Sequence, residues 1–171
     1  MGLIQLYFGR GKGKTTAALG LGLRASGHGF KVNMIQFMKG NTKYGELNAV
    51  KGIENFEIHQ FGRIDLIMEP EKIDIEEGKK ALKYAEEIIL SNEYDIVILD
   101  EIGVALEMHI IKIDDVMNLI EKKPEKVELI LTGGQKIHPK IKERADLITE
   151  MKMIKHYFST KGIQARLGIE Y

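Results

Sequence analysis

The stretch Gly9-Arg10-Gly11-Lys12-Gly13-Lys14-Thr15-Thr16 decides the fold of this 171-residue chain. It follows the apolar run LIQLYF (3–8), which predicts a buried strand, and precedes the small, apolar stretch AALGLGLRAS (17–26), which predicts a helix. A glycine-rich turn between a strand and a helix points its backbone N–H groups inward, and the start of the helix adds the positive end of its dipole. The stretch therefore predicts a phosphate-binding loop.

Two side chains in this loop predict how it would act. Lys14 would place a positive charge on the phosphates, and the hydroxyl of Thr15 would be a ligand for Mg²⁺. The candidate nucleotide-binding residues are the whole loop: Gly9, Arg10, Gly11, Lys12, Gly13, Lys14, Thr15 and Thr16. The usual pattern G-x-x-x-x-G-K-[ST] has a glycine where this chain has Phe8, so the match is incomplete. A glycine-rich turn that binds nothing is the alternative.

Strands and helices are expected to alternate along the rest of the chain. Predicted strands are residues 31–37, 56–61, 94–101, 127–132 and 146–150, and predicted helices are 74–91, 113–122 and 139–145. Asp74 is placed to cap the first of these helices. The strands are apolar throughout, which is typical of a mostly parallel sheet with helices on both faces. We expect a single α/β domain over residues 1–171 with five to six strands.

Polar residues follow several of the predicted strands. Parallel strands end at one edge of a sheet, where such folds bind ligands, so Asp100 and Glu101 should lie near the glycine loop. Thr15, Asp100 and Glu101 are thus the candidate metal ligands, although spacing alone does not say which carboxylate would touch the ion. Solvated carboxylates at a strand end are the alternative. Lys39 would either face the same edge or extend into solvent.

Composition excludes several classes of protein. The 25 Lys and Arg residues balance 25 Asp and Glu residues, which argues against a nucleic-acid partner. Without cysteine the chain has no disulfide, no thiolate zinc site and no cysteine nucleophile, which fits a reducing compartment. No apolar run approaches the roughly 18 residues that a membrane span needs, and no signal-peptide pattern is present. We therefore expect a cytoplasmic protein without a membrane partner.

The glycine loop and several distant motifs together resemble one family. QFMKG (36–40), LDEI (99–102), LTGG (131–134) and KGIQARLGIEY (161–171) are similar to segments of the P-loop type of ATP:corrinoid, or ATP:cob(I)alamin, adenosyltransferase, and the similarity covers nearly the whole chain. The resemblance implies a RecA-like fold and transfer of the 5′-deoxyadenosyl group of ATP to the Co(I) centre of a corrinoid, with release of triphosphate. It implies ATP as co-substrate, Mg²⁺, a reductase or other low-potential electron donor, and a homodimer.

The same resemblance implies roles for individual residues and shows two departures. Lys14 would neutralise the phosphates, and Glu101 with Thr15 would serve the metal. Relatives commonly have a Gly-Phe-x-Trp segment whose aromatic rings lie against the corrinoid, whereas the stretch Phe61–Met68 has Arg63 and Asp65 at those positions. We therefore expect reduction of Co(II) to be harder than alkylation of Co(I). The second departure is Gly134, where the family usually has an arginine.

Two other functions fit the phosphate loop. A P-loop ATPase or kinase would direct attack at the γ-phosphate and would need a group that activates water or a hydroxyl, for which the sequence offers no compelling candidate. A non-catalytic ATP- or corrinoid-binding protein would account for the missing aromatic residues and for Gly134.

Overall fold

The computed structural model describes residues 1–40, 43–65 and 67–171, and its centre is a six-stranded sheet. All the pairings are parallel, in the order β3-β2-β4-β5-β1-β6. The strands are β1 (Ile4–Phe8), β2 (Val32–Phe37), β3 (Phe56–Phe61), β4 (Ile96–Asp100), β5 (Glu128–Thr132) and β6 (Leu147–Glu150). The predicted parallel α/β sheet is confirmed, and it is consistent with a RecA-like P-loop domain.

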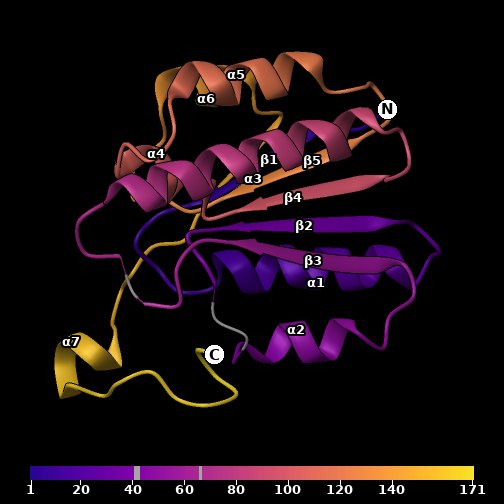
Figure 1. Ribbon diagram of the computed structural model, residues 1–171. Coiled ribbons are helices and arrows are strands. Elements are labelled where there is room, and N and C mark those ends of the chain that lie inside the picture. The colour runs from indigo at the N-terminus through magenta and orange to yellow at the C-terminus, as the bar shows by residue number, and fades with distance from the viewer. Residues whose placement is uncertain (41–42, 66) are drawn as a thin grey trace.

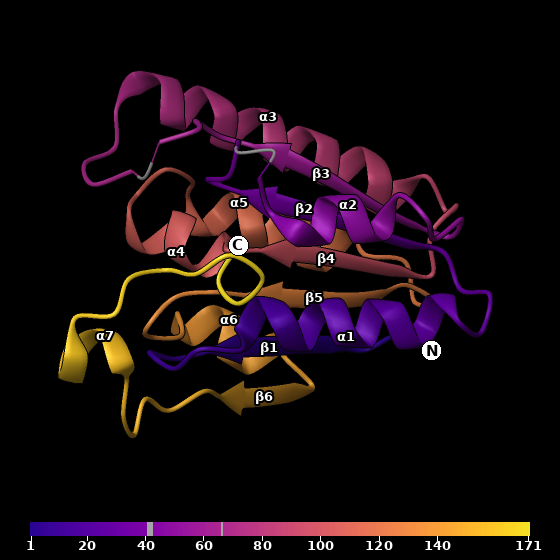
Figure 2. The same ribbon diagram turned by 90° about the horizontal axis from the view of Figure 1, so that it is seen from below.

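Helices cover both faces of this sheet (Figure 1). One face carries α1 (Lys14–Ser26) and α2 (Gly45–Val50), and the other carries α3 (Lys72–Leu90), α4 (Ile102–Glu107), α5 (Ile113–Lys122) and α6 (Pro139–Arg144). A last short helix, α7 (Tyr157–Lys161), lies away from the sheet. The chain then returns, so that its C-terminal segment curls beside the beginning of α1 (Figure 2).

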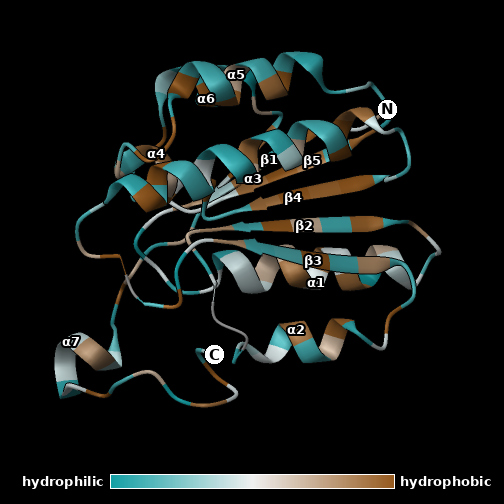
Figure 3. Cartoon of the chain, viewed as in Figure 1, coloured by the Kyte–Doolittle hydropathy of each residue, from teal (hydrophilic) through white to brown (hydrophobic). Residues whose placement is uncertain are grey.

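The apolar strands explain why the sheet needs two helical layers. Successive side chains point to opposite faces, so Ile35 and Leu99 pack under α3 and α5, whereas Met34 and Ile98 pack under α1. All residues of β2 and β4 are buried. Figure 3 shows the central strands as hydrophobic and the outer surfaces of the helices as largely hydrophilic.

The start of α3 differs from the prediction. The helix begins at Lys72, and the residue that precedes it, Glu71, is the N-cap. Asp74 is therefore not the N-cap, but it does help to cap the helix: it is the N3 residue of a capping box, and its Oδ2 accepts a hydrogen bond of 2.8 Å from the backbone N–H of Glu71. Helices α2, α4 and α7, of five or six residues, were not predicted, because such short segments show little helical periodicity; α6, which is equally short, was predicted at 139–145.

The strand order places the functional motifs next to one another. β5 lies between β1, which leads into the glycine loop, and β4, which ends at Asp100. Thr132 at the end of β5 therefore lies between the loop and the two carboxylates. No helix in the described part of the chain is long and apolar enough to span a membrane.

Candidate nucleotide site at the carboxyl edge of the sheet

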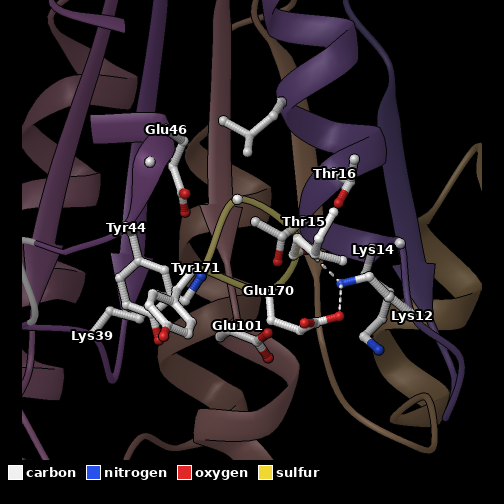
Figure 4. A pocket seen from close by; sticks show the side chains of 15 residues that line it. Lys12, Lys14, Thr15, Thr16, Lys39, Tyr44, Glu46, Glu101, Glu170 and Tyr171 are labelled. Carbon is white, nitrogen blue, oxygen red and sulfur yellow. Dashed lines mark hydrogen bonds and ion pairs between the residues drawn. The ribbon is translucent and has the colours of Figure 1, made fainter. Parts of the chain in front are cut away.

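A cavity of about 480 Å³ opens where the predicted motifs meet (Figure 4). Its walls come from four parts of the chain that are far apart in sequence: the glycine loop with the beginning of α1, the segment from the end of β2 to the start of α2, Glu101 after β4, and the C-terminal segment. The polar and charged side chains among its lining are Lys12, Lys14, Thr15, Thr16, Lys39, Tyr44, Glu46, Glu101, Glu170 and Tyr171. An elongated polyanion bound here would meet positive charge on two sides.

The glycine loop is braced by the backbone of neighbouring segments. The N–H of Gly9 donates to the carbonyl of Gly134 at 2.9 Å, and the N–H of Gly11 donates to the carbonyl of Met151 at 2.6 Å. Of the predicted loop residues, Lys12 to Thr16 line the cavity. Gly9, Arg10 and Gly11 form the outer part of the loop and are not among the lining residues.

Lys14 closes the loop from within. Its Nζ donates to the carbonyl oxygens of Gly9 and Gly11, each at 2.9 Å. These carbonyls hold the ammonium group at the centre of the loop, beside the first turn of α1. The positive charge of Lys14 is therefore in place before a ligand arrives. A bound phosphate would compete with the two carbonyls for the N–H groups of the ammonium.

Asp100 is the centre of a buried hydrogen-bond network. Its Oδ1 accepts from Thr15 at 2.9 Å and from Thr132 at 2.6 Å, and its Oδ2 accepts from Gln36 at 3.2 Å and from Lys39 at 2.8 Å. The residue is fully buried. Four donors satisfy its two oxygens, so the carboxylate acts by fixing the side chains around it.

Glu101 points its carboxylate at the cavity instead. Its backbone is left-handed, with φ of +61°, and its N–H donates to Thr132 Oγ1 at 3.0 Å. Burial, together with the negative charge of Asp100, raises the pKa of Glu101 above its ordinary value. A nearby cation would stabilise the ionised form of this carboxylate, which burial and Asp100 disfavour.

The oxygen atoms at this point suit Mg²⁺. The ion prefers hydroxyl, carboxylate and phosphate oxygens and is usually held by only one or two protein groups. Glu101 lines the cavity beside Thr15, while Asp100 fixes the Thr15 hydroxyl from behind. In residues 1–40, 43–65 and 67–171, no three His, Asp or Glu side chains gather into a metal site of their own. Phosphate oxygens would therefore complete the coordination.

Lys39 faces the site and not solvent. Its side chain is only 13 % exposed and its Nζ lies 2.8 Å from Asp100 Oδ2. The ammonium also lies 5.2 Å from the centre of the Tyr44 ring. Of the two sequence-based interpretations, the structure supports the one that places Lys39 on the functional edge.

The C-terminal segment forms a wall that sequence analysis did not anticipate. Lys12 Nζ donates to the carbonyl of Ile169 at 2.9 Å and lies 3.3 Å from Glu170 Oε1. Glu170 also accepts hydrogen bonds from the Tyr157 hydroxyl and from the N–H of Arg166. These contacts, led by the one from Tyr157, lower the pKa of Glu170 to about 2.

Arg63, which stands where the family resemblance implies an aromatic residue, has structural partners. Its Nε and Nη2 donate to the two oxygens of Asp74, each at 2.8 Å, and its Nη1 donates to Glu71 at 2.7 Å. The guanidinium thus ties the loop after β3 to the start of α3. Asp65 is exposed, and Leu66 lies outside the described residues.

Gly134 has a backbone role that explains the second departure. Its φ of +80° is left-handed, and an added Cβ would lie 3.3 Å from the backbone of Gly103. An arginine would be strained in this conformation. The carbonyl of Gly134 accepts the hydrogen bond from Gly9, so the residue supports the phosphate loop through its backbone.

Comparison with known proteins identifies the family. The whole chain, residues 1–171, matches the family described as ATP:corrinoid adenosyltransferase BtuR/CobO/CobP. It is 33 % identical to a corrinoid adenosyltransferase of Escherichia coli (strain K12), over 99 % of this chain and 86 % of that protein. Identity to proteins of the same name is 33 % in Pseudomonas aeruginosa and 35 % in Sinorhizobium sp, over 99 % of this chain and 84 % and 80 % of those proteins. The chain therefore belongs to the ATP:corrinoid adenosyltransferase family.

Proposed function

We propose that this protein transfers the 5′-deoxyadenosyl group of ATP to the Co(I) centre of a corrinoid, with the cavity beside α1 holding the triphosphate that leaves. The observation that carries the proposal is the convergence of Lys12, Lys14 and Lys39 on one cavity of about 480 Å³. Family membership indicates the reaction. The three lysines indicate where triphosphate, its most highly charged product, would bind.

The protein's work in this reaction is positioning and charge stabilisation. The cobalt supplies the electron pair for the new Co–C bond, and the pair of the broken C5′–O bond goes to the triphosphate, so no side chain has to act as nucleophile or base. Loop residues from Lys12 to Thr16 would hold the phosphates, and Lys14 would stabilise the negative charge that develops on them. Donors fixed before the reaction need no reorganisation during it.

Mg²⁺ fits the same arrangement. Thr15 and Glu101 would hold the ion, and Asp100 would orient Thr15 through its hydrogen bond. The ion would supply positive charge to the phosphate oxygens. This assignment predicts that Glu101 accounts for most of the magnesium dependence of ATP binding.

ATP hydrolysis is the second candidate activity because of Glu101. Its carboxylate lines the cavity, and burial raises its pKa, so it could accept a proton from water near a phosphate. In an adenosyltransferase the same carboxylate serves the metal. The products distinguish the two activities, because hydrolysis gives ADP and orthophosphate.

The setting of the reaction follows from its chemistry. Co(I) must be formed from Co(II), so we propose a low-potential electron donor in the cytoplasm as partner, and the resemblance to the family supports a homodimer. Because Arg63 is paired with Asp74 and carries no ring, we expect slow turnover from Co(II) and faster turnover from preformed Co(I). Equal rates from the two starting states would contradict this expectation, and sedimentation would test the dimer.

The decisive assay combines purified protein, ATP, Mg²⁺ and a corrinoid that has been chemically reduced to Co(I). We expect a light-sensitive Co–C product, detected by its absorbance before and after illumination. Tight binding of ATP and corrinoid without this product would instead indicate a non-catalytic binding protein.

A further inference from the structure

Lys39, the lysine of the cavity that lies outside the phosphate loop, is held in an unusual way. It lies just beyond β2, across the cavity from the loop that contains Lys14 (Figure 4). Lysine side chains are almost never buried unless they are paired. This one is 13 % exposed and paired with Asp100, which is itself fully buried.

The backbone around Lys39 is shaped to aim it at the cavity. Met38 adopts a left-handed conformation, with φ of +59°, which is uncommon for a residue other than glycine. The loop after β3 crosses so closely that a Cβ on Gly62 would lie 2.7 Å from the backbone nitrogen of Lys39. A Cβ on Gly40 would lie 2.2 Å from the carbonyl oxygen of Gly62. Strain of this kind persists where the surrounding structure enforces it, and it is concentrated at functional sites.

The environment keeps Lys39 charged. Its Nζ donates a hydrogen bond of 2.8 Å to the carboxylate of Asp100, and a charge-assisted bond of this kind favours the ammonium form. Asp100 does not depend on this one contact, because Gln36, Thr15 and Thr132 also donate to it. The ammonium can therefore contact a ligand while the carboxylate stays in place.

We propose that Lys39 is a catalytic residue that contacts the triphosphate opposite Lys14 and stabilises it as the C5′–O bond breaks. This inference rests on the proposed function and extends it. Co(I) provides both electrons of the Co–C bond, and the electrons of the broken bond stay on the triphosphate. Lys39 donates a hydrogen bond to that product and transfers no proton, so its contribution is greatest when the leaving oxygen is most negative.

The test compares three substitutions at this position with a control. Lys39→Met removes the charge, Lys39→Gln removes the charge but keeps a donor for Asp100, and Lys39→Arg keeps the charge. Lys72→Met is the control, because the Lys72 side chain is 92 % exposed at the start of α3. If Lys39→Met fails to fold, Lys39→Gln carries the test.

Two readouts are needed, one with turnover and one without. With Co(I) supplied, the neutral variants should lower kcat roughly 100-fold while changing the KM for ATP less than about threefold, and arginine should restore part of the rate. Inorganic triphosphate, titrated by calorimetry, should bind the neutral variants about tenfold more weakly than the native protein, and the Lys72→Met control as tightly as the native protein.

The outcomes separate this inference from the function on which it rests. A neutral variant that folds, binds triphosphate normally and keeps kcat within threefold of the native protein would overturn the role of Lys39. Native protein that binds triphosphate but forms no Co–C bond would overturn the adenosyl transfer, and the role of Lys39 in triphosphate binding would then be decided by calorimetry. Native protein that forms the Co–C bond but does not bind triphosphate would overturn the role of Lys39 and leave the adenosyl transfer standing.

Discussion

Two walls of the cavity differ in how they are held. The sheet wall is formed by residues at the carboxyl edge of the sheet, and the C-terminal wall is formed by the last residues of the chain. At the sheet wall, Asp100 is fully buried and accepts four hydrogen bonds from residues at the ends of two strands, β2 and β5, and from Thr15 at the start of α1. At the C-terminal wall, Glu170 reaches the loop through Lys12, and its neighbours Leu167 and Ile169 are 78 % and 55 % exposed. The sheet wall is therefore fixed before a ligand binds, whereas the C-terminal wall can move when a ligand binds.

Removal of the charge at the centre of the loop should have the largest effect. Lys14→Ala should lower the rate of Co–C bond formation roughly 1,000-fold, at the upper end of what one lost donor to a developing charge costs. The fold should survive, because Lys14 bonds only to carbonyl oxygens of its own loop in the described structure. The circular dichroism spectrum checks the fold. Retained activity would refute the phosphate-loop assignment.

Damage to the sheet wall should reduce both stability and activity. Asp100→Asn leaves the buried ammonium of Lys39 without a charged partner, so the free energy of unfolding should fall by about 3 kcal/mol. Denaturant unfolding measures this change. Asp114→Asn is the matched control, because Asp114 pairs with Lys140 at a side-chain exposure of 81 % and its loss should leave the free energy of unfolding almost unchanged. Equal effects of the two variants would show that the sheet wall is not preorganised.

Glu101→Gln should make the protein more stable and less active. The folded protein raises the pKa of Glu101, so it binds this proton more readily than the unfolded chain does, and ionisation of Glu101 lowers the free energy of unfolding as pH rises. Glutamine does not ionise. The variant should therefore melt a few degrees higher at pH 8, with the difference shrinking as pH falls through the raised pKa toward the ordinary glutamate range.

The activity of the same variant should change in the other direction. Loss of the proposed metal ligand should weaken the magnesium dependence of ATP binding and lower turnover by about 10- to 100-fold. A variant that is both less stable and fully active at pH 8 would contradict the role of Glu101.

Loosening the C-terminal wall should have the smallest effect. Glu170→Gln removes a negative charge beside Lys12, and charge pairs at the surface are weak, so ATP should bind only about threefold more tightly. The melting temperature should fall slightly, because the hydrogen bonds that lower the pKa of Glu170 favour its ionised form in the folded protein. Calorimetric titration with ATP checks the direction, and Glu93→Gln, an exposed glutamate on the loop before β4, is a control for net charge. Weaker binding would mean that Glu170 helps to hold the nucleotide.

The sequence allowed prediction of those features that depend on local patterns. Continuous apolar runs predict parallel strands, and the rule that such strands end at one edge brings Thr15, Asp100 and Glu101 together. Thr132 reaches the same edge because it ends β5. What could not be predicted is how Asp100 divides its hydrogen bonds among Gln36, Lys39 and the two threonines.

Features that depend on long-range packing escaped prediction for a physical reason. Lys12 pairs with a residue 158 positions away, and no local period records where the end of a chain returns. Sequence analysis interpreted Arg63 only as the replacement of an aromatic residue. Its pairing with Asp74 was not predicted, because Asp74 was interpreted only as a helix cap. The short helix α2, which carries Glu46 into the cavity, lacks the length to show a pattern.

The most direct test of the account is to identify the phosphate product by ³¹P nuclear magnetic resonance during turnover with Co(I) corrinoid and ATP. The account treats the cavity as a holder for a leaving group, so inorganic triphosphate should appear intact and in step with the Co–C product. Orthophosphate with ADP as the only products would show that the γ-phosphate is attacked instead, and would contradict the account.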